Sequence, residues 1–342
     1  MKYFLILFFI IGGAYLFVVS SVSAPILPDV PPKNTETIDV PFKEMTIPYL
    51  RTRPYKSSLG DLRLYEEKEF YRSYLTSYDS DGLVINALLT IPKEAAPTEG
   101  YPAIVFVHGY IPPTVYTTTG RYTDYVDYLA RNGFVVLKID LRGHGTSQGT
   151  ASGAYYSGDY VIDTLNAYAA LQSYSMVNPN SIGLWGHSMA GNVTMRAFVA
   201  NQHIPALVIW AGAVYSYSDL ATYRLNDNSY RPPSLSTERQ KQREALRMTH
   251  GDYSPESEFW NMVVPIHYLE GVTGAVELHH AVNDDVVDVG YSRDLVKILD
   301  STHIPHTLYE YQTGGHNISG SAFSQAMART VSFFKFHLGG VE

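Results

Sequence analysis

Apolar and polar positions alternate with two different periods along most of the chain. Residues 71–78 and 83–91 alternate on either side of a turn at Asp79-Ser-Asp-Gly82, which predicts an antiparallel hairpin. A continuous apolar run, typical of a buried parallel strand, follows at 103–107, and further strand patterns follow at 134–139, 180–187, 205–209, 275–279 and 306–311. Helical patterns separate these runs at 121–132, 159–174, 192–200, 291–301 and 321–338. This alternation predicts an α/β fold with one mostly parallel sheet covered by helices on both faces.

One segment interrupts the alternation. Between the strand that ends near Ala211 and the strand that begins at Ala275, the chain contains two helix-like stretches, at 236–249 and 255–260. An insertion at this place would lie over the carboxyl ends of the strands, where open α/β sheets bind ligands. We therefore expect a helical cap at about residues 212–265 that shapes a substrate pocket. A peripheral helical decoration is the alternative.

The amino-terminal residues predict export from the cytoplasm. An uncharged apolar run at 3–19 follows Lys2, and behind it Val22 and Ala24 are the small residues that signal peptidase reads before its cut. The run also reaches the roughly 17 to 25 residues that cross a bilayer. Residues 1–24 are therefore expected to be a cleaved signal peptide or a retained membrane anchor with the folded part outside. We predict an extracytoplasmic protein, either secreted or membrane-anchored.

The remaining chain divides into two parts. Residues 25–70 are rich in proline and short polar residues without sustained periodicity, which predicts an extended linker or arm. Residues 71–342 contain the strand and helix patterns and are expected to form one domain that includes the cap. The formal charge of −8 argues against a nucleic-acid partner, because phosphate binding needs a basic surface. The chain contains no cysteine, which excludes disulfides, thiol catalysis and thiolate metal sites.

A serine stands at the sharpest junction of this pattern. The apolar run at 180–187 ends in Gly186-His-Ser-Met-Ala-Gly191, and a helix pattern begins directly behind it. A G-x-S-x-G elbow needs strand, turn and helix in this order, because the turn raises the serine hydroxyl above the sheet. The last position of the pattern is Ala190 rather than glycine. We predict that Ser188 is a nucleophile; a plain helix N-cap is the structural alternative.

A serine hydroxyl becomes a nucleophile only when a base removes its proton and a third group holds that base. In this architecture the acid and then the histidine follow the serine, each in a loop after a strand. Asp284 follows the strand at 275–279, and His316 lies in a glycine-flanked loop after the last strand. We predict that these two residues complete a catalytic triad. Asp285 competes with Asp284 for the role of the acid, and Asp288 is a weaker candidate for it.

An acyl-transfer enzyme also needs two backbone N–H groups that stabilise the developing negative oxygen. Met189 directly follows the serine and would supply one of them. The other is expected from the loop after the strand at 103–107, where His108-Gly109-Tyr110 combines a bracing histidine with a glycine that lets the backbone approach closely. We assign this second N–H to Tyr110.

Two other groups of polar residues have structural explanations. The strand at 134–139 runs into Asp140-Leu-Arg-Gly-His-Gly145, whose arginine and histidine are expected to fix the loop. His279 and His280 precede the candidate acids, and the four side chains together suggest a metal site. Adjacent strand residues point to opposite faces of a sheet, however, which favours simple sheet packing for the histidine pair. We therefore expect neither a metal nor a cofactor.

Several stretches in combination resemble the α/β-hydrolase superfamily: Val107-His-Gly-Tyr110, Asp140-Leu-Arg-Gly-His-Gly145, Gly186-His-Ser-Met-Ala-Gly191, His280-Ala-Val-Asn-Asp284 and Gly314-Gly-His316. More narrowly, about residues 71–338 are similar to the prolyl-oligopeptidase-type (S9) peptidase catalytic domain and to related esterases and dienelactone hydrolases. The resemblance implies the triad Ser188, Asp284 and His316. The β-propeller that gates the larger oligopeptidases does not fit in the upstream residues, so its filtering of peptide size does not transfer.

These observations predict an exported serine hydrolase that acts through an acyl-enzyme. We expect first an S9-like serine peptidase acting on short peptides. A carboxylesterase or dienelactone-hydrolase-like esterase acting on small or lipid-like esters is the second expectation. A catalytically silent surface scaffold that keeps the fold for binding is the alternative from a different class. The expected partner is a short-peptide or other small-molecule substrate.

Overall fold

The computed structural model describes residues 40–223, 225 and 237–339, with side chains of the last range described from residue 240 onward. Clustering of contacts separates residues 1–37 from residues 38–342, and the description below concerns the second unit alone. The expected signal peptide or anchor at 1–24 lies outside the described residues. Within the described ranges, no helix combines the length and apolar character that crossing a membrane requires.

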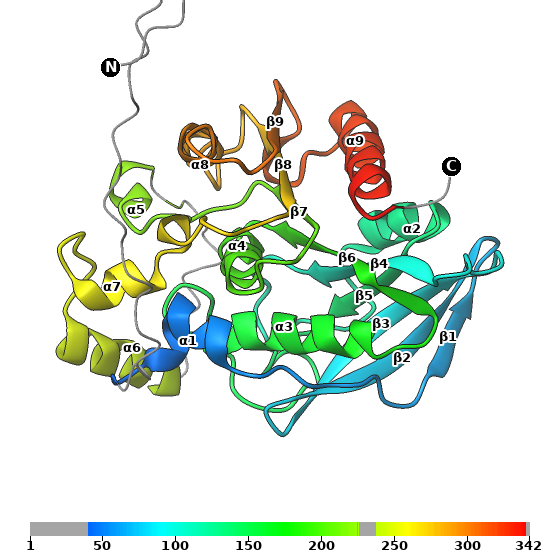
Figure 1. Ribbon diagram of the computed structural model, residues 1–342, viewed down its shortest axis with the longest axis horizontal. Helices are drawn as coiled ribbons and strands as arrows, with labels where there is room; N and C mark the ends of the chain where they lie inside the picture. The colour runs from blue at the N-terminus through cyan, green and yellow to red at the C-terminus, as the bar shows by residue number, and fades with distance from the viewer. Residues whose placement is uncertain (1–39, 224, 226–236, 340–342) are drawn as a thin grey trace, which may run out of the picture. The chain divides into compact units, whose positions relative to one another are not determined.

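A nine-stranded sheet forms the centre of the described unit, in the order β1-β2-β3-β5-β4-β6-β7-β8-β9 (Figure 1). The strands are β1 (Arg63–Glu67), β2 (Tyr71–Ser80), β3 (Leu83–Pro92), β4 (Tyr101–Val107), β5 (Val135–Ile139), β6 (Val177–His187), β7 (Ala206–Trp210), β8 (Ala275–Ala281) and β9 (His306–Tyr311). The pairs β1–β2, β2–β3 and β3–β5 are antiparallel, whereas the six strands from β5 to β9 in this order are parallel to one another. This arrangement confirms the predicted hairpin and the predicted mostly parallel sheet.

Two apolar cores lie on the two faces of the sheet. All seven residues of β4 are buried; Val105 and its alternate neighbours enter one core, whereas Ile104 and Phe106 enter the other. Because successive side chains of a strand point to opposite faces, a strand that is covered on both sides is apolar at most of its positions. This requirement explains the continuous apolar runs of the sequence.

Helices cover both faces, as the alternating pattern predicts. They are α1 (Ile47–Thr52), α2 (Thr123–Arg131), α3 (Asp159–Gln172), α4 (Ala190–Ala200), α5 (Asp219–Thr222), α6 (Thr237–His250), α7 (Glu258–Val263), α8 (Gly290–Leu299) and α9 (Ser321–His337). Helices α2 and α9 pack into the core of Ile104, and α1, α3, α4 and α8 pack into the core of Val105 (Figure 1). The predicted helices are thus found within a few residues of their expected bounds.

The expected extended arm at 25–70 differs from the structure over its described part. A short 3-10 helix, Lys43–Met45, and α1 bury the side chains of Met45, Ile47 and Leu50 completely. Arg196 of α4, itself fully buried, donates hydrogen bonds to the carbonyl oxygens of Met45 (2.6 Å) and Ser157 (2.8 Å). The segment from residue 40 is therefore part of the domain. Its elements are too short to show a helical or strand period in the sequence.

The insertion between β7 and β8 contains α5, α6 and α7, as well as a 3-10 helix, Pro265–His267. The ring of His250 stacks on Phe259 with centroids 3.6 Å apart, and its Nε2–H donates to the carbonyl oxygen of Pro41 at 2.8 Å. Trp260 is buried and packs edge-on against the ring of Tyr156. Helix α7 also contacts α1 (Figure 1). The described part of the insertion is therefore anchored on the amino-terminal helices and on the loop before α3.

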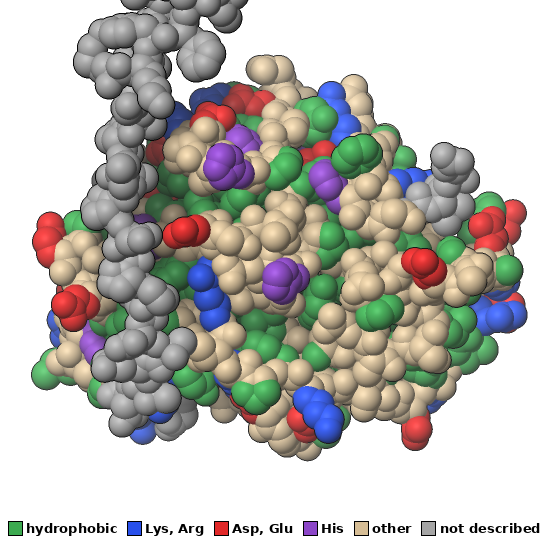
Figure 2. Space-filling model, in the orientation of Figure 1, with side chains coloured by type: hydrophobic (Ala, Val, Ile, Leu, Met, Phe, Trp, Pro, Cys, Tyr) green, Lys and Arg blue, Asp and Glu red, His purple; other side chains and the backbone are tan. Residues whose placement is uncertain are grey.

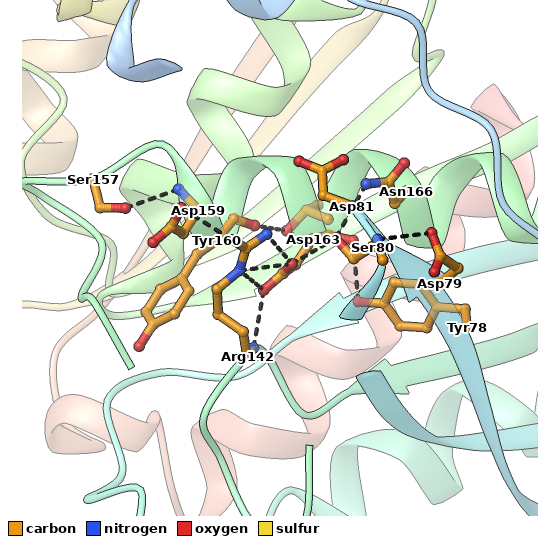
Figure 3. A network of polar contacts seen from close by, with 12 residues as sticks. Tyr78, Asp79, Ser80, Asp81, Arg142, Ser157, Asp159, Tyr160, Asp163 and Asn166 are labelled. Atoms are coloured by element: carbon orange, nitrogen blue, oxygen red, sulfur yellow. Dashed lines mark hydrogen bonds and ion pairs between the residues drawn. The ribbon is translucent and has the colours of Figure 1, made fainter. Parts of the chain in front are cut away.

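A buried ionic network holds the connection between β5 and α3 (Figure 3). Arg142 donates to both carboxylate oxygens of Asp163, with Nη2–Oδ1 at 2.7 Å, and its Nη1 reaches Asp159 at 3.1 Å. The hydroxyl of Ser80 in β2 donates to the same Asp163 carboxylate at 2.7 Å. Arg142 thus joins this loop to α3, and Asp163 joins α3 to β2.

Charged side chains are dispersed over the face of the described unit shown in Figure 2, rather than gathered in a single basic patch. The formal charge of the whole chain is −8. Nucleic acids are bound mainly through clustered lysine and arginine side chains that contact phosphates. This face of the molecule offers no such cluster among its described residues.

Candidate active site

The serine elbow is a strained and closely packed turn between β6 and α4. Ser188 has φ +56°, in the left-handed region that non-glycine residues rarely adopt. Its N–H donates to the carbonyl oxygen of Trp210 at 2.9 Å, which ties the turn to β7. A Cβ atom on Gly191 would lie 2.7 Å from the Cα atom of Gly212, so only glycine fits there. Ala190, the departure from the usual motif, is completely buried and fits the turn.

The structure brings the three predicted triad residues together. The Oγ atom of Ser188 lies 2.8 Å from Nε2 of His316, and Nδ1 of His316 lies 2.8 Å from Oδ2 of Asp284. The three residues follow β6, β9 and β8, whose carboxyl ends meet at one edge because the strands are parallel. Of the competing acids, Asp285 is exposed, and Asp288 accepts the N–H of Gly290 at the start of α8.

Asp284 is held as a carboxylate. Its Oδ1 accepts the backbone N–H groups of Val286 (2.9 Å) and Val287 (3.0 Å). Burial by itself raises the pKa of Asp284, but hydrogen bonds from His280, His316 and Val287 hold this pKa well below its usual range. A carboxylate at Nδ1 fixes the proton of His316 on that nitrogen, so Nε2 is left to accept the proton of Ser188.

His280 supports the acid, a role that the prediction of simple sheet packing missed. It is fully buried; its Nδ1 accepts the hydroxyl of Ser292 at 2.8 Å, and its Nε2–H donates to the carbonyl oxygen of Val287 at 2.9 Å. The same Nε2 lies 3.4 Å from Oδ2 of Asp284. The neighbouring His279 instead contacts Glu277 and Tyr311. The four-residue spacing between His280 and Asp284 at a strand end was the available signal.

A chain of hydrogen bonds links the elbow to the loops on either side of it. The N–H of Gly109 donates to the hydroxyl oxygen of Tyr122 (3.0 Å), and that hydroxyl donates to Nδ1 of His187 (2.8 Å). The Nε2–H of His187 then donates to the carbonyl oxygen of His316 (2.9 Å). Burial lowers the pKa of His187 to about 3, so the ring is neutral, with one acceptor and one donor as this chain requires. Sequence reasoning missed both His187 and Tyr122.

Buried polar residues support the loop that carries Tyr110. Asp140 accepts hydrogen bonds from the hydroxyls of Tyr116 (3.0 Å) and Thr118 (2.5 Å). Burial raises the pKa of Asp140 to about 6 and lowers that of His108, whose ring stacks on Tyr116, to about 3. His108 therefore braces the loop as expected. A Cβ atom on Gly109 would lie 2.8 Å from the Tyr122 hydroxyl, which explains the glycine beside it.

A cavity of about 460 Å³ opens at Ser188. It is lined by the loop before α2, by the start of α2 and by the loops after β6, β8 and β9: Gly109, Tyr110, Ile111, Pro112, Val115, Arg121, Tyr122, Tyr125, His187, Ser188, Val286, His316 and Asn317. No described residue of the insertion at 212–265 contributes to this lining. The described part of the insertion therefore lies outside the wall of this cavity, and the expectation that the insertion shapes the pocket stays a prediction for residues 224 and 226–236, which lie outside the description.

The metal site that the sequence suggested at the histidine pair does not assemble. His279 and His280 point to opposite faces of β8, and each has its own hydrogen-bond partners. Within the described ranges, no group of three or more histidine, aspartate or glutamate side chains has the arrangement of a metal site.

Comparison with protein sequences finds relatives among the peptidases. The profile of a family described as serine aminopeptidase, S33, matches residues 100–230. Over 250 residues the chain is 26% identical to a Bacillus subtilis protein named uncharacterized peptidase YtmA, which corresponds to 72% of this chain and 86% of that protein. These matches cover the serine elbow and the loop of Tyr110.

Comparison with solved structures finds esterases and peptidases of the same fold. Acetyl xylan esterase 1 from a Thermoanaerobacterium species aligns with a TM-score of 0.60 and 18% identity, over 85% of this chain and 93% of that one. An acylaminoacyl peptidase from Pyrococcus horikoshii aligns with a TM-score of 0.63 and 20% identity over 80% of this chain. The chain spans only 43% of that peptidase. The sheet, the serine elbow and these similarities together show that the chain has the α/β-hydrolase fold and is a serine hydrolase.

Proposed function

We propose that Ser188, His316 and Asp284 cleave a carboxylic ester or amide through an acyl-enzyme. The Ser188 oxygen attacks the carbonyl carbon while Nε2 of His316 takes its proton, and the same nitrogen then protonates the leaving group. Water hydrolyses the acyl-enzyme with His316 again as the base. Asp284 keeps the imidazole in the required tautomer. The observation that carries this proposal is the pair of 2.8 Å contacts that joins the three side chains.

The backbone N–H groups of Met189 and Tyr110 are assigned as the donors that bind the oxyanion. Met189 precedes the first residue of α4, and the first amides of a helix have no partner within it. The N–H of Gly109 already donates to Tyr122, which leaves Tyr110 as the donor on the opposite loop. Both residues flank the cavity that contains Ser188, and Tyr110 lines it.

Short peptides are the proposed substrates, in the manner of an S9-like serine peptidase. The sequence-level relatives support this choice, because both the matched family and the Bacillus subtilis protein are described as peptidases. The solved acylaminoacyl peptidase is only partly covered by this chain, over 43% of its length. A small peptide, rather than a folded protein, suits a cavity of about 460 Å³.

Small esters are the second candidate, for a different reason. The chain covers 93% of acetyl xylan esterase 1, so an esterase of similar length shares its fold. Esters have better leaving groups than amides, and the same triad serves both reactions. Side-by-side kinetics on a tripeptide p-nitroanilide and a p-nitrophenyl ester distinguish the candidates. Ester turnover without amide cleavage would replace the peptidase proposal with the esterase one.

Covalent labelling tests the proposed chemistry itself. A fluorophosphonate probe is expected to label the wild-type protein and to leave Ser188→Ala unlabelled, with an unchanged melting temperature. Loss of the nucleophile should lower kcat by several orders of magnitude. A wild-type protein that remains unlabelled under conditions where it is folded would contradict the proposal and favour the silent scaffold.

Export is also proposed, on the apolar run at 3–19 and the small residues before Ala24. Expression of the full chain with a carboxyl-terminal tag, followed by cell fractionation, separates the outcomes. Recovery outside the cytoplasm at a reduced mass indicates cleavage, and recovery in membranes at full mass indicates an anchor. Full-length protein in the cytosol would contradict export.

A further inference from the structure

The cavity at Ser188 contains an arginine that the proposed chemistry does not use. Among its described lining residues, Arg121 is the only one with a permanent charge. It is exposed, lies at the end of the loop before α2, and forms no ion pair or hydrogen bond with any described residue. By contrast, Arg131 at the other end of α2 approaches Asp127 at 3.5 Å. Arg121 therefore contributes a positive charge to the cavity wall, beside Tyr122 and without a described ion-pair or hydrogen-bond partner.

The hydroxyl groups of two tyrosines in the cavity wall are already engaged. The Tyr122 hydroxyl bonds to Gly109 and His187, and the Tyr125 hydroxyl donates to the carbonyl oxygen of Asn317 at 2.8 Å. Much of the remaining described wall is aliphatic, and it includes no aspartate or glutamate. A substrate ammonium group therefore finds no carboxylate among these residues, whereas a substrate carboxylate finds a guanidinium.

We infer that the preferred substrate carries a carboxylate at some distance from the scissile carbonyl, and that Arg121 binds it. This inference rests on the proposed function of Ser188. A guanidinium matches a carboxylate with two parallel hydrogen bonds, and the apolar wall accommodates the chain between the two groups. The net charge of −8 repels anions at long range, so the preference must arise from the local contact.

Two matched substrate pairs test the inference on either side of the scissile bond. The first pair is mono-4-nitrophenyl suberate and its methyl ester; the second is acetyl-trialanine and its carboxyl-terminal amide. For at least one pair, we expect the ratio of kcat/KM for the anionic over the neutral substrate to fall about tenfold in Arg121→Gln. Arg121→Lys should retain part of the preference, because the positive charge remains but the guanidinium that forms two parallel hydrogen bonds is lost.

The matched control is Arg131→Gln, which removes the same charge from the other end of α2 and should leave both ratios unchanged. Binding of suberate to Ser188→Ala, measured by calorimetry, should weaken severalfold when Arg121→Gln is added. Ser188-dependent hydrolysis with ratios and binding unaffected by Arg121→Gln would overturn this inference and leave the proposed function intact. Absence of both probe labelling and hydrolysis would overturn the proposed function, and the inference with it.

Discussion

Two buried aspartates of this protein are surrounded by similar numbers of hydrogen-bond donors, yet their settings differ. The carboxylate of Asp163 in α3 accepts hydrogen bonds from the guanidinium of Arg142, from the backbone N–H of Arg142 and from the hydroxyl of Ser80 (Figure 3). Asp284 accepts from two backbone N–H groups and from His316. The side chains of both aspartates are fully buried.

The partners at the far end of each network make the difference. Arg142 keeps its proton at all ordinary pH values and therefore cannot accept one from a substrate. His316 has a second nitrogen, which reaches Ser188 at the wall of a cavity. A buried carboxylate thus serves folding or chemistry according to whether its hydrogen bonds end inside the protein or at a titratable group that substrate can reach.

The largest expected effect comes from breaking the network that opens to the cavity. In Asp284→Asn, the amide oxygen still accepts the N–H groups of Val286 and Val287, so the protein folds. The amide group no longer fixes the His316 tautomer, and we expect kcat/KM to fall about 10⁴-fold. Steady-state kinetics normalised to folded protein measure this loss. The control is Asp285→Asn, an exposed neighbour; an equal loss in that variant would contradict the assignment of the acid.

Breaking the network around Asp163, whose hydrogen bonds end inside the protein, should lower stability rather than catalytic activity. Asp163→Asn leaves the Arg142 guanidinium without its main buried partner, and we expect the free energy of unfolding to fall by about 3–5 kcal/mol. Urea denaturation measures this change. The kcat per probe-labelled site should stay near the wild-type value. A large decrease in kcat per labelled site would show that this network also reaches the active site.

The neutral chain through His187 predicts a pH dependence of stability. The folded-state pKa of about 3 lies below the usual 6.5, so the contribution of His187 is complete above pH 6.5 and is lost as the pH falls toward 3. Between pH 7.5 and pH 5, this amounts to about 2 kcal/mol of unfolding free energy. Asp140, whose pKa is raised to about 6, acts in the opposite sense as its carboxylate gains a proton.

Wild type and His187→Gln share all their other titratable groups. A comparison of the two proteins therefore isolates the contribution of His187 to the pH dependence of stability. The stability difference between the two proteins should be about 2 kcal/mol larger at pH 7.5 than at pH 5. Urea melts at both pH values measure it. Parallel pH profiles for the two proteins would show that His187 is not held neutral.

The smallest expected effect concerns the support behind the acid. His280→Leu removes the ring that lies beside Asp284, and we expect kcat to fall about tenfold with KM nearly unchanged. His280→Gln retains a donor and should recover part of this loss. The control is His279→Gln, on the opposite face of β8, which should affect stability but not kcat. Equal kcat losses in the His279 and His280 variants would indicate a general effect on the strand.

Much of the fold and of the candidate site follows from local sequence patterns. The apolar runs and helical periods locate the parallel strands and most helices, because a strand buried on both faces carries mostly apolar side chains. The short elements before residue 63 escaped prediction, since α1 has six residues and completes fewer than two turns. Proline content predicts an extended arm here, whereas the burial of Leu50 depends on the distant helix α4.

The site shows the same division. The motif around Ser188 and the glycine-flanked His316 are local signals, and their order in the chain points to the triad. The chain of hydrogen bonds through Tyr122 and His187 is not a local signal. Its bonds join Tyr122 to His187 and His187 to His316, which are 65 and 129 residues apart in the sequence. The cavity wall likewise comes from the loop before α2, the start of α2 and the loops after β6, β8 and β9, not from the described part of the insertion.

The sequence alone determined the alternation of strands and helices, the sharp turn at Ser188 and the presence of an acid and a histidine after later strands. Only the tertiary structure decided that Asp284 and not Asp285 faces His316, that His187 and His280 support the site, and that Arg121 lies in the cavity. The physical reason is that periodicity and turn chemistry act between neighbours in the chain. Which loops meet, and which side chain faces a cavity, depends on the register and order of strands that are distant in sequence.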